Sequence, residues 1–365
     1  MMQKPPKPIL ILGAYGRGNA GDDVFILSAA ALFPDRTLYI NSANDALLPA
    51  EVRGHIKTIS TVSPWDLYKK IMLFIRIKEV VYWGGDLWVK LYGTRTPRQL
   101  LYKMVFTNAL LRLSRKKIYY IGCGIGDLSG YSRWLAQLSG CMASAIVVRE
   151  QRSAKTLNLP KVKVLPDLAI NLPYHQPVLH TISPKRPFSI VVSMLWSVPD
   201  PAHNFPVLVK ELTALLDSLP AEQFKITLLP MHVAGEKYDD LWASQELALN
   251  MKRRAVEIYS ARDLPSIISL LAESDLVLGG RLHANILAVL NGTPAIGIAY
   301  RPKVQSFFTD NGLADYVVGI SALHTLPQLF WHIHNDYARA AKVFYKAGKT
   351  NLSKRAAYAT LVSDL

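Results

Sequence analysis

The sequence has few cysteines and no long hydrophobic run. Only Cys123 and Cys141 occur among 365 residues, which excludes a disulfide scaffold, and no group of histidine, cysteine and acidic residues has the spacing of a zinc site. No stretch reaches about 18 uncharged apolar residues, so we expect no spanning helix. The first residues combine prolines with a strand-like run, unlike a signal peptide. We therefore expect a metal-free, non-spanning protein of the reducing cytoplasm.

Acidic residues are scarce between residues 57 and 117, where thirteen Lys and Arg stand against three acids in a chain of net charge +15. Two segments, 67–78 and 97–117, mix apolar residues at helical spacing with Lys and Arg. This pattern is typical of a helix on an anionic membrane surface, and equally of an ordinary helix with a basic solvent face. No nucleic-acid-binding motif is present, so we expect no nucleic acid partner.

Short apolar runs alternate with longer amphipathic segments along the chain. The predicted strands are 8–16, 37–42, 79–85, 117–126, 144–150, 188–196, 224–232, 255–260, 275–280 and 294–300. The predicted helices are 21–33, 63–78, 97–115, 130–142, 205–218, 236–249, 263–273, 283–291 and 302–312. Near-continuous Val, Ile and Leu strands that alternate with helices predict parallel sheets covered on both faces. The fold class is therefore α/β, with two Rossmann-like domains.

A proline-rich stretch, NLPYHQPVLHTISPKRP, interrupts this alternation and is the best linker in the sequence. We place an N-terminal domain over residues 1–170, the linker over 171–187 and a C-terminal domain over 188–335. The remaining segment, 336–365, is helical in pattern, and we expect it to pack back on the first domain.

Polar clusters follow several predicted strands, at the edge where open parallel sheets bind their ligands. GNAGDD follows the first strand; we expect Asp22 or Asp23 to cap the next helix and Asn19 to be available to a substrate hydroxyl. These three residues are candidates for binding an acceptor.

Three further strand ends carry candidate side chains. WGGDLW places Trp83 near Asp86, and an aromatic ring beside a carboxylate is as typical of a sugar site as of a turn. LLPMH ends at His232, a secondary acceptor candidate. Arg149 follows the strand in VVREQRS, where it either pairs with Glu150 or presents a fork to a carboxylate or phosphate.

The most informative junction is GGRLH, where Arg281 and His283 stand between a predicted strand and a predicted helix. A helix N-terminus disfavours the charged form of histidine unless an anion lies beside it. A bound phosphate would therefore recharge His283, which suits an acid–base group for an anionic substrate. A lone histidine here would be interpreted as a cap or core residue, but the neighbouring arginine favours a function.

These motifs, together with PDLA and the run GTPAIGIAYRPK, resemble the polysaccharide pyruvyl transferase family over residues 10 to about 312. The resemblance implies a glycosyltransferase-B-like fold. It also implies a pyruvyltransferase that moves pyruvate from phosphoenolpyruvate to two hydroxyls of a sugar, as a cyclic ketal, in a cell-surface polysaccharide (exopolysaccharide) or its lipid-linked precursor. The family often has GDE and GGG where this chain ends the motifs with Asp23 and Asp86, so the acceptor contacts are less defined than the donor contacts.

The resemblance implies that the donor is bound by Arg149, Arg281, Leu282 and Lys303 and that His283 and Arg281 are catalytic. Phosphoenolpyruvate carries a carboxylate and a phosphate, and these fixed cations match its charge without a metal or cofactor. His283 either protonates the vinyl carbon or deprotonates a sugar hydroxyl; both roles stay open. We expect removal of His283 to cost about 10² to 10⁴ in rate.

Two alternatives remain. A glycosyltransferase-B enzyme that uses a nucleotide sugar would need a carboxylate for the ribose or base after the donor loop, and residues 284–312 offer none before Asp310. A non-catalytic sugar- or lipid-binding scaffold is the other. In the favoured interpretation, the basic helices bring the protein to the cytoplasmic membrane face, where a sugar or lipid-linked oligosaccharide acceptor lies.

Overall fold

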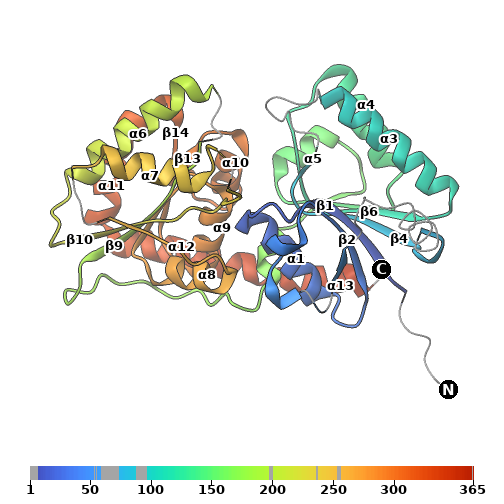
Figure 1. Cartoon of the computed structure of the whole chain (residues 1–365), viewed down its shortest axis with the longest axis horizontal. Helices are drawn as coiled ribbons and strands as arrows, with labels where there is room; N and C mark the ends of the chain where they lie inside the picture. Colours follow the sequence, from blue (N-terminus) through green and yellow to red (C-terminus); the bar gives the residue numbers. More distant parts are fainter. Residues whose placement is uncertain are drawn as a thin grey trace. The chain divides into compact units, whose positions relative to one another are not determined.

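The computed structural model describes residues 7–52, 54, 56–58, 74–87, 97–196, 200–235, 237–252, 256–363 and 365. The chain forms two compact units, which we describe separately (Figure 1). Unit 1 comprises Met1–Arg17, Asp22–Leu172 and Lys354–Leu365. Unit 2 comprises Gly18–Gly21 and Pro173–Ser353, so a four-residue segment from the beginning of the chain belongs to it.

Unit 1 is built on an eight-stranded sheet in which every pairing is parallel. Its strands are β1 (Ile9–Tyr15), β2 (Leu38–Ser42), β3 (Ile56–Thr58), β4 (Glu79–Trp83), β5 (Asp86–Leu87), β6 (Lys117–Ile125), β7 (Ala145–Val148) and β8 (Val162–Val164). They lie in the order β3-β2-β1-β4-β6-β7-β8, with β5 beside β6. The order reverses between β1 and β4, which is where open α/β sheets bind ligands.

Helices cover both faces of this sheet. They are α1 (Ala20–Leu32), α3 (Pro97–Leu113), α4 (Gly130–Cys141), α5 (Gln151–Leu157) and α13 (Arg355–Ser363). In Figure 1, α3 and α4 lie on one face and α1 and α13 on the other. Val80 and Tyr82 of β4 pack in the cluster that contains Leu135 of α4, whereas Trp83 donates to the Phe25 carbonyl of α1. The alternation of a strand thus divides the core into two layers.

Unit 2 has a six-stranded parallel sheet in the order β11-β10-β9-β12-β13-β14. Its strands are β9 (Phe188–Ser193), β10 (Phe224–Leu228), β11 (Val256–Ile258), β12 (Leu276–Gly279), β13 (Ala295–Ala299) and β14 (Val317–Gly319). In chain order this is 3-2-1-4-5-6, the arrangement of a dinucleotide-binding Rossmann fold. The reversal falls between β9 and β12, so GGRLH lies at the switch point of unit 2.

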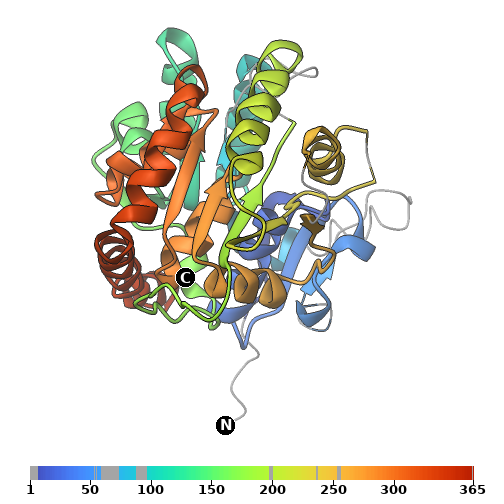
Figure 2. The same cartoon turned by 90° about the vertical axis from the view of Figure 1, so that its left-hand side faces the viewer.

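The helices of unit 2 pack on both sides of its sheet (Figure 2). They are α6 (Pro201–Asp217), α7 (Asp240–Asn250), α8 (Leu264–Glu273), α9 (Leu282–Asn291), α10 (Pro302–Asp310), α11 (Leu326–Asn335) and α12 (Tyr337–Leu352). Helix α9 contacts α8 and α12, whereas α6 contacts α7 and α11. Within the described residues, none of the helices is both long and apolar enough to cross a bilayer.

The predicted strands are confirmed, but four short strands and one helix were not predicted. Strands β3, β5, β8 and β14 have two or three residues each, too few for a periodic pattern. Helix α5 has the polar sequence QRSAKTL, without an apolar stripe. Most of the predicted helix 63–78 lies outside the described residues.

The C-terminal helix α13 packs back on unit 1, as predicted. Arg355 donates to the carbonyls of Ile170 at 2.6 Å and Leu172 at 2.8 Å, and Tyr358 donates to Pro166 at 2.8 Å. The boundaries of the units differ from the predicted domains, because α12 belongs to unit 2 and so does the proline-rich stretch.

Candidate functional site

The GGRLH junction of unit 2 is a tightly packed turn between β12 and α9. A Cβ on Gly279 would lie 2.1 Å from Asn285 Oδ1, and one on Gly280 would lie 2.6 Å from the Ser193 carbonyl. Asn285 closes the turn by donating to the carbonyls of Gly279 at 2.8 Å and Arg281 at 3.0 Å. Only glycine fits at the two turn positions, and the turn fixes Arg281 as the residue that precedes α9.

The Arg281 side chain is held by a buried carboxylate. Its Nε and Nη2 atoms donate to the two oxygens of Asp240 at 2.8 and 2.5 Å. Asp240 begins α7, is fully buried, and also accepts from the backbone amides of Met231 at 3.2 Å and His232 at 2.9 Å. This bidentate pair fixes the plane of the guanidinium, whose side chain is 19% exposed.

Asp240 was not predicted as a partner of Arg281. It lies 41 residues upstream and looks like an ordinary acid at a helix start. Leu282 is 5% exposed, so its side chain belongs to the core, and a donor contact there would have to come from its backbone.

The segment Gly18–Gly21 joins this site. It pairs with residues 231–233 through two backbone hydrogen bonds of 2.8 Å, and Asn19 and His232 form an antiparallel bridge. A Cβ on Gly21 would lie 2.3 Å from Nδ1 of His283, so the glycine allows the backbone to touch the imidazole. We call the set Asn19, Gly21, His232, Asp240, Arg281 and His283 the arginine–histidine cluster.

The start of α1 differs from the prediction. The helix begins at Ala20, and Asn19 Oδ1 accepts from the Gly21 amide at 3.0 Å. Asn19 is therefore the capping residue, and Asp22 and Asp23 lie inside the first turn. The prediction that one of the two aspartates caps the helix is wrong, because the helix starts earlier than its apolar pattern.

Asp23 has an unusual environment for a carboxyl group. Burial, followed by the nearby charges of Asp22 and Glu51, raises its pKa to about 8. Such a group exchanges a proton near neutral pH, which is a property of acid–base residues as well as of some structural clusters.

A second group of cations follows β13, the neighbour of β12 in the sheet. Arg301 precedes α10 directly, and Lys303 lies in the first turn of that helix. The Arg301 Cζ atom lies 5.8 Å and the Lys303 Nζ atom 6.0 Å from the ring centre of Tyr300. The Y-x-P-K run predicted Lys303 but not Arg301, which occupies the variable position of that run.

The starts of α7, α8, α9 and α10 differ in how they are capped. Asp239 caps α7 by accepting from Trp242, and Asp263 caps α8 by accepting from Ser266. In contrast, α9 and α10 start after Arg281 and Arg301, and neither arginine makes a side-chain cap bond. Because a helix N-terminus carries partial positive charge, these two starts and Arg301 form an electropositive part of the sheet edge, whereas Asp240 offsets the charge of Arg281.

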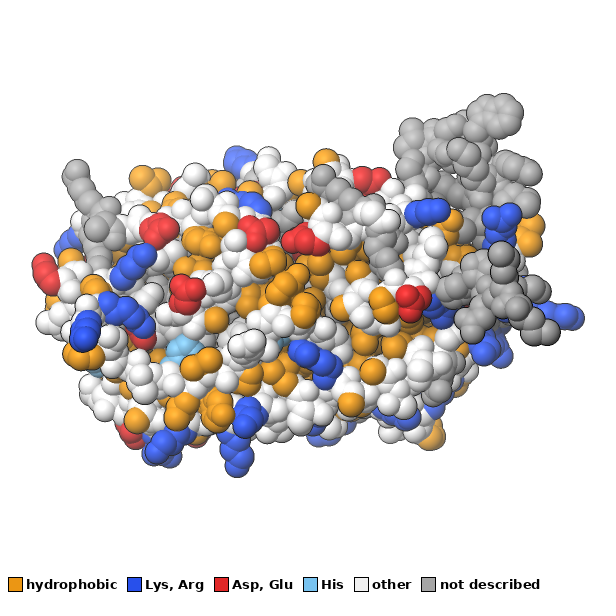
Figure 3. All heavy atoms as spheres, turned by 90° about the horizontal axis from the view of Figure 1, so that it is seen from below, with side chains coloured by type: hydrophobic (Ala, Val, Ile, Leu, Met, Phe, Trp, Pro, Cys, Tyr) orange, Lys and Arg blue, Asp and Glu red, His pale blue; other side chains and the backbone are white. Residues whose placement is uncertain are grey.

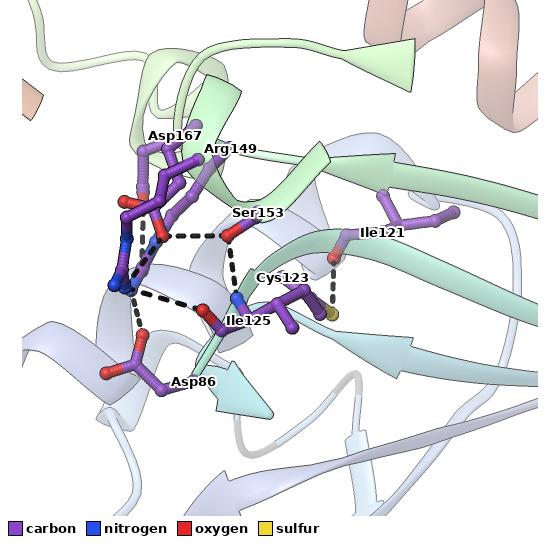
Figure 4. A network of polar contacts seen from close by, with 9 residues as sticks. Asp86, Ile121, Cys123, Ile125, Arg149, Ser153 and Asp167 are labelled. Atoms are coloured by element: carbon purple, nitrogen blue, oxygen red, sulfur yellow. Dashed lines mark hydrogen bonds and ion pairs between the residues drawn. The ribbon is translucent and has the colours of Figure 1, made fainter. Parts of the chain in front are cut away.

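In unit 1, Arg149 is a buried cross-link. Its side chain is 5% exposed; Nη1 donates to Asp167 at 3.1 Å and Nη2 to Asp86 (Figure 4). Burial would lower the pKa of the guanidinium, but the carboxylates of Asp86 and Asp167 outweigh it and raise the pKa above the usual value. Glu150, the expected partner, instead accepts from Ser153 at 2.7 Å.

The predicted sugar contact of Trp83 is not compatible with its surroundings. The side chain is 1% exposed, and its Nε1 donates to the Phe25 carbonyl of α1 at 2.8 Å. An indole buried in the core cannot stack on a bound sugar, so this prediction is wrong. Asp86 is partly exposed but engaged by Arg149, and Trp88 lies outside the described residues.

A cavity of about 810 Å³ opens elsewhere in unit 2, mainly between α6 and α7. Trp196, Phe205 and Trp242 line its apolar part, and none of the predicted site residues belongs to it. Within the described residues, no group of three or more His, Cys, Asp and Glu side chains is arranged to hold a metal ion.

Comparison with known proteins identifies a family and a fold. A family model for polysaccharide pyruvyl transferase matches residues 19–302, a span that contains every predicted site residue except Lys303, which follows it directly. None of the curated proteins matches the sequence.

Several solved structures are similar over nearly the whole chain. HepE of Anabaena, in complex with UDP and glucose, has a TM-score of 0.64 and 14% identity, over 99% of this chain and 100% of that one. A putative UDP-N-acetylglucosamine 2-epimerase of Listeria monocytogenes has a TM-score of 0.60 and 14% identity, covering 98% and 95%. Sucrose-phosphate synthase of Thermosynechococcus elongatus has 0.58 and 12%, covering 98% of both chains. At such identities the likeness concerns the fold alone, and the predicted glycosyltransferase-B-like fold is confirmed.

Proposed function

The chain belongs to the polysaccharide pyruvyl transferase family, and on this premise we propose that it transfers pyruvate from phosphoenolpyruvate to two hydroxyls of a sugar. The product is a cyclic ketal on a cell-surface polysaccharide or its lipid-linked precursor. The observation that carries the proposal is the arginine–histidine cluster, in which a buried carboxylate orients Arg281 two residues before His283.

The donor fits the charges at this edge of unit 2. Phosphoenolpyruvate carries close to three negative charges at neutral pH and needs several fixed cations. Because Asp240 offsets the charge of Arg281, that arginine contributes mainly N–H groups that are held in a fixed orientation. Arg301, Lys303 and the starts of α9 and α10 contribute the positive charge. We propose no metal and no cofactor for this step.

His283 is the proposed proton-transfer residue. The Gly21 backbone lies against its Nδ1 atom and its Nε2 atom is buried, so proton transfer through Nε2 requires the side chain to move when the substrate binds. A proton delivered to C3 of phosphoenolpyruvate makes C2 electrophilic, and the first sugar hydroxyl adds there with loss of its own proton. The second hydroxyl then displaces phosphate, which closes the ketal and leaves a methyl group at C3. Acid–base groups of this kind contribute about 10² to 10⁴ in rate.

The acceptor side is proposed for Asn19, Asp22, Asp23 and His232. Asp23 is our candidate for the base that takes a hydroxyl proton, since its pKa of about 8 matches that role. Asp86 remains an acceptor candidate, oriented by Arg149. The two carboxylate partners of Arg149 favour this orienting role over direct contact with the donor.

The direct test is incubation of the purified protein with phosphoenolpyruvate and a panel of lipid-linked and nitrophenyl sugars. We expect release of inorganic phosphate together with a sugar product that carries a pyruvyl ketal by mass spectrometry. His283→Ala serves as the inactive control. Phosphate release without a ketal product would contradict the proposal.

A glycosyltransferase that uses a nucleotide sugar is the second candidate, because HepE was solved with UDP and glucose on the same fold. The family match and the absence of an acid in the sequence between the donor loop and Asp310 favour pyruvyl transfer. Consumption of a UDP-sugar in the same assay would support the glycosyltransferase. Turnover of neither donor would favour a sugar- or lipid-binding scaffold.

A further inference from the structure

Helix α3 of unit 1 carries a second apolar stripe that faces solvent. Its members are Tyr102, Phe106, Leu110 and Leu113, between 46% and 81% exposed. Their spacing of four, four and three residues places them on one face of the helix. The buried face is formed by other residues, among them Leu101 and Leu111, so the outward stripe is not needed for the core.

Helix α4 repeats this arrangement beside it. Tyr131, Trp134 and Leu138 are between 38% and 52% exposed at a spacing of three and four residues, whereas Leu135 is buried. The rings of Tyr131 and Trp134 stack with centres 5.4 Å apart.

The two stripes meet. The Tyr102 hydroxyl donates to the Tyr131 hydroxyl at 3.1 Å, and the ring centres are 6.1 Å apart. We call these seven side chains of α3 and α4 the α3–α4 apolar face. Scattered exposed apolar residues are normal on soluble proteins, but a continuous set of large ones marks a surface that binds something.

The charge around this face is almost entirely positive. Arg115 and Lys117 are exposed directly after α3, and the exposed acid Asp127 pairs with Arg152. Lys103 and Arg112 of α3 are exposed beside the stripe. In contrast, the face drawn in Figure 3 shows acidic side chains among the basic ones.

We propose that the α3–α4 apolar face docks on an anionic lipid bilayer. Tyr and Trp side chains favour the water–lipid boundary, Phe and Leu enter the acyl region, and Lys and Arg contact anionic headgroups. A second copy of this chain is disfavoured as occupant, because it would bring two positive surfaces together. The proposal does not rest on the donor chemistry, although a lipid-linked acceptor would lie at the same surface.

Flotation with vesicles tests the proposal. The full chain should float with phosphatidylglycerol/phosphatidylcholine vesicles and far less with phosphatidylcholine alone, and added salt should weaken binding. The triple variant F106S/L110S/L113S should bind at least about tenfold more weakly. Leu249→Ser is the matched control, since Leu249 is 79% exposed on α7 of unit 2, and its binding should equal that of the parent.

Two further measurements show whether the α3–α4 apolar face enters the lipid and whether the triple variant is folded. Brominated lipid should quench part of the tryptophan fluorescence of the parent, and Trp134→Phe should abolish that part. The thermal midpoint of the triple variant should match that of the parent, which shows that it is folded. Equal vesicle binding by the parent and the triple variant, or no binding at low salt, would overturn the proposal. So would a dimer that the triple variant dissociates in light scattering, because the face would then be a self-interface.

Discussion

Each unit of the molecule places an arginine after a strand of its parallel sheet, and the two arginines are used differently. Arg149 divides its guanidinium between Asp86 and Asp167, which belong to separate elements of unit 1, and its side chain is 5% exposed. Arg281 gives two donors to one carboxylate, Asp240, and is 19% exposed.

The difference shows that position in the topology does not by itself define a ligand contact. Arg149 ties together β5, the end of β7 and the segment that carries Asp167, so it acts first as a cross-link. Arg281 lies in a glycine turn two residues before His283, and the carboxylate of Asp240 at the start of α7 orients it. The comparison predicts that changes around Arg281 affect turnover and that changes around Arg149 affect stability.

The largest effect is expected for His283→Ala. Loss of the proposed proton-transfer group should lower kcat/KM for phosphoenolpyruvate by about 10² to 10⁴, with little change in the thermal midpoint. Phosphate release with saturating acceptor measures it. A variant that keeps more than half of the parent activity would remove His283 from the mechanism.

The two arginine variants compare the units directly. Arg149→Ala leaves two carboxylates, one of them buried, without their cation and should lower the free energy of unfolding by ~3–5 kcal/mol. Arg281→Ala should cost less stability, because it leaves one carboxylate without its cation instead of two, and Asp240 keeps the amides of Met231 and His232 as donors. Urea unfolding followed by circular dichroism measures both. The comparison fails if Arg281→Ala is the more destabilised of the two.

Asp240→Asn tests whether the position of Arg281 matters beyond its charge. The amide can accept only on one side, so the bidentate hold is lost and the guanidinium moves. A misplaced group of this kind can cost about 10² in kcat/KM. Asp167→Asn is the matched change in unit 1, and it should reduce stability with less effect on turnover in the folded protein.

The smallest effect concerns the pH dependence of stability. The pKa of Asp23 is about 8 in the folded protein, above the value of 3.8 for an ordinary aspartate, so the folded state binds more protons between these values. The unfolding free energy should therefore fall as pH rises through that window. Asp23→Asn removes this pH-dependent contribution to stability. The unfolding free energy of the variant should equal that of the parent near pH 4 and exceed it above pH 8. Parallel curves for the two proteins would contradict the assigned environment.

Most of the fold could be predicted from the sequence, because long apolar strands alternate with amphipathic helices and each GG turn follows a strand. The partners of the site residues could not. Asp240 is 41 residues from Arg281, and Asp86 is 63 residues from Arg149, so each pair forms only when distant strand ends meet.

The error at Trp83 has a simpler origin. The residues of β4 after Glu79 are all apolar and the whole strand is buried, so its sequence does not show that Trp83 points into the core. Helix α4 was predicted correctly, but the exposure of Tyr131 and Trp134 was not predicted, because it depends on which face of the helix meets the sheet.

The central claim is that Arg281 binds the donor and that Arg149 is a cross-link. It is tested most directly by isothermal titration of phosphoenolpyruvate, without acceptor, into the parent, Arg281→Ala and Arg149→Lys proteins. The account predicts that the parent binds phosphoenolpyruvate and that folded Arg149→Lys binds it almost as well. Arg281→Ala should bind at least about tenfold more weakly, since a charge-assisted hydrogen bond contributes ~1.5–3 kcal/mol. Unchanged affinity in Arg281→Ala would contradict it.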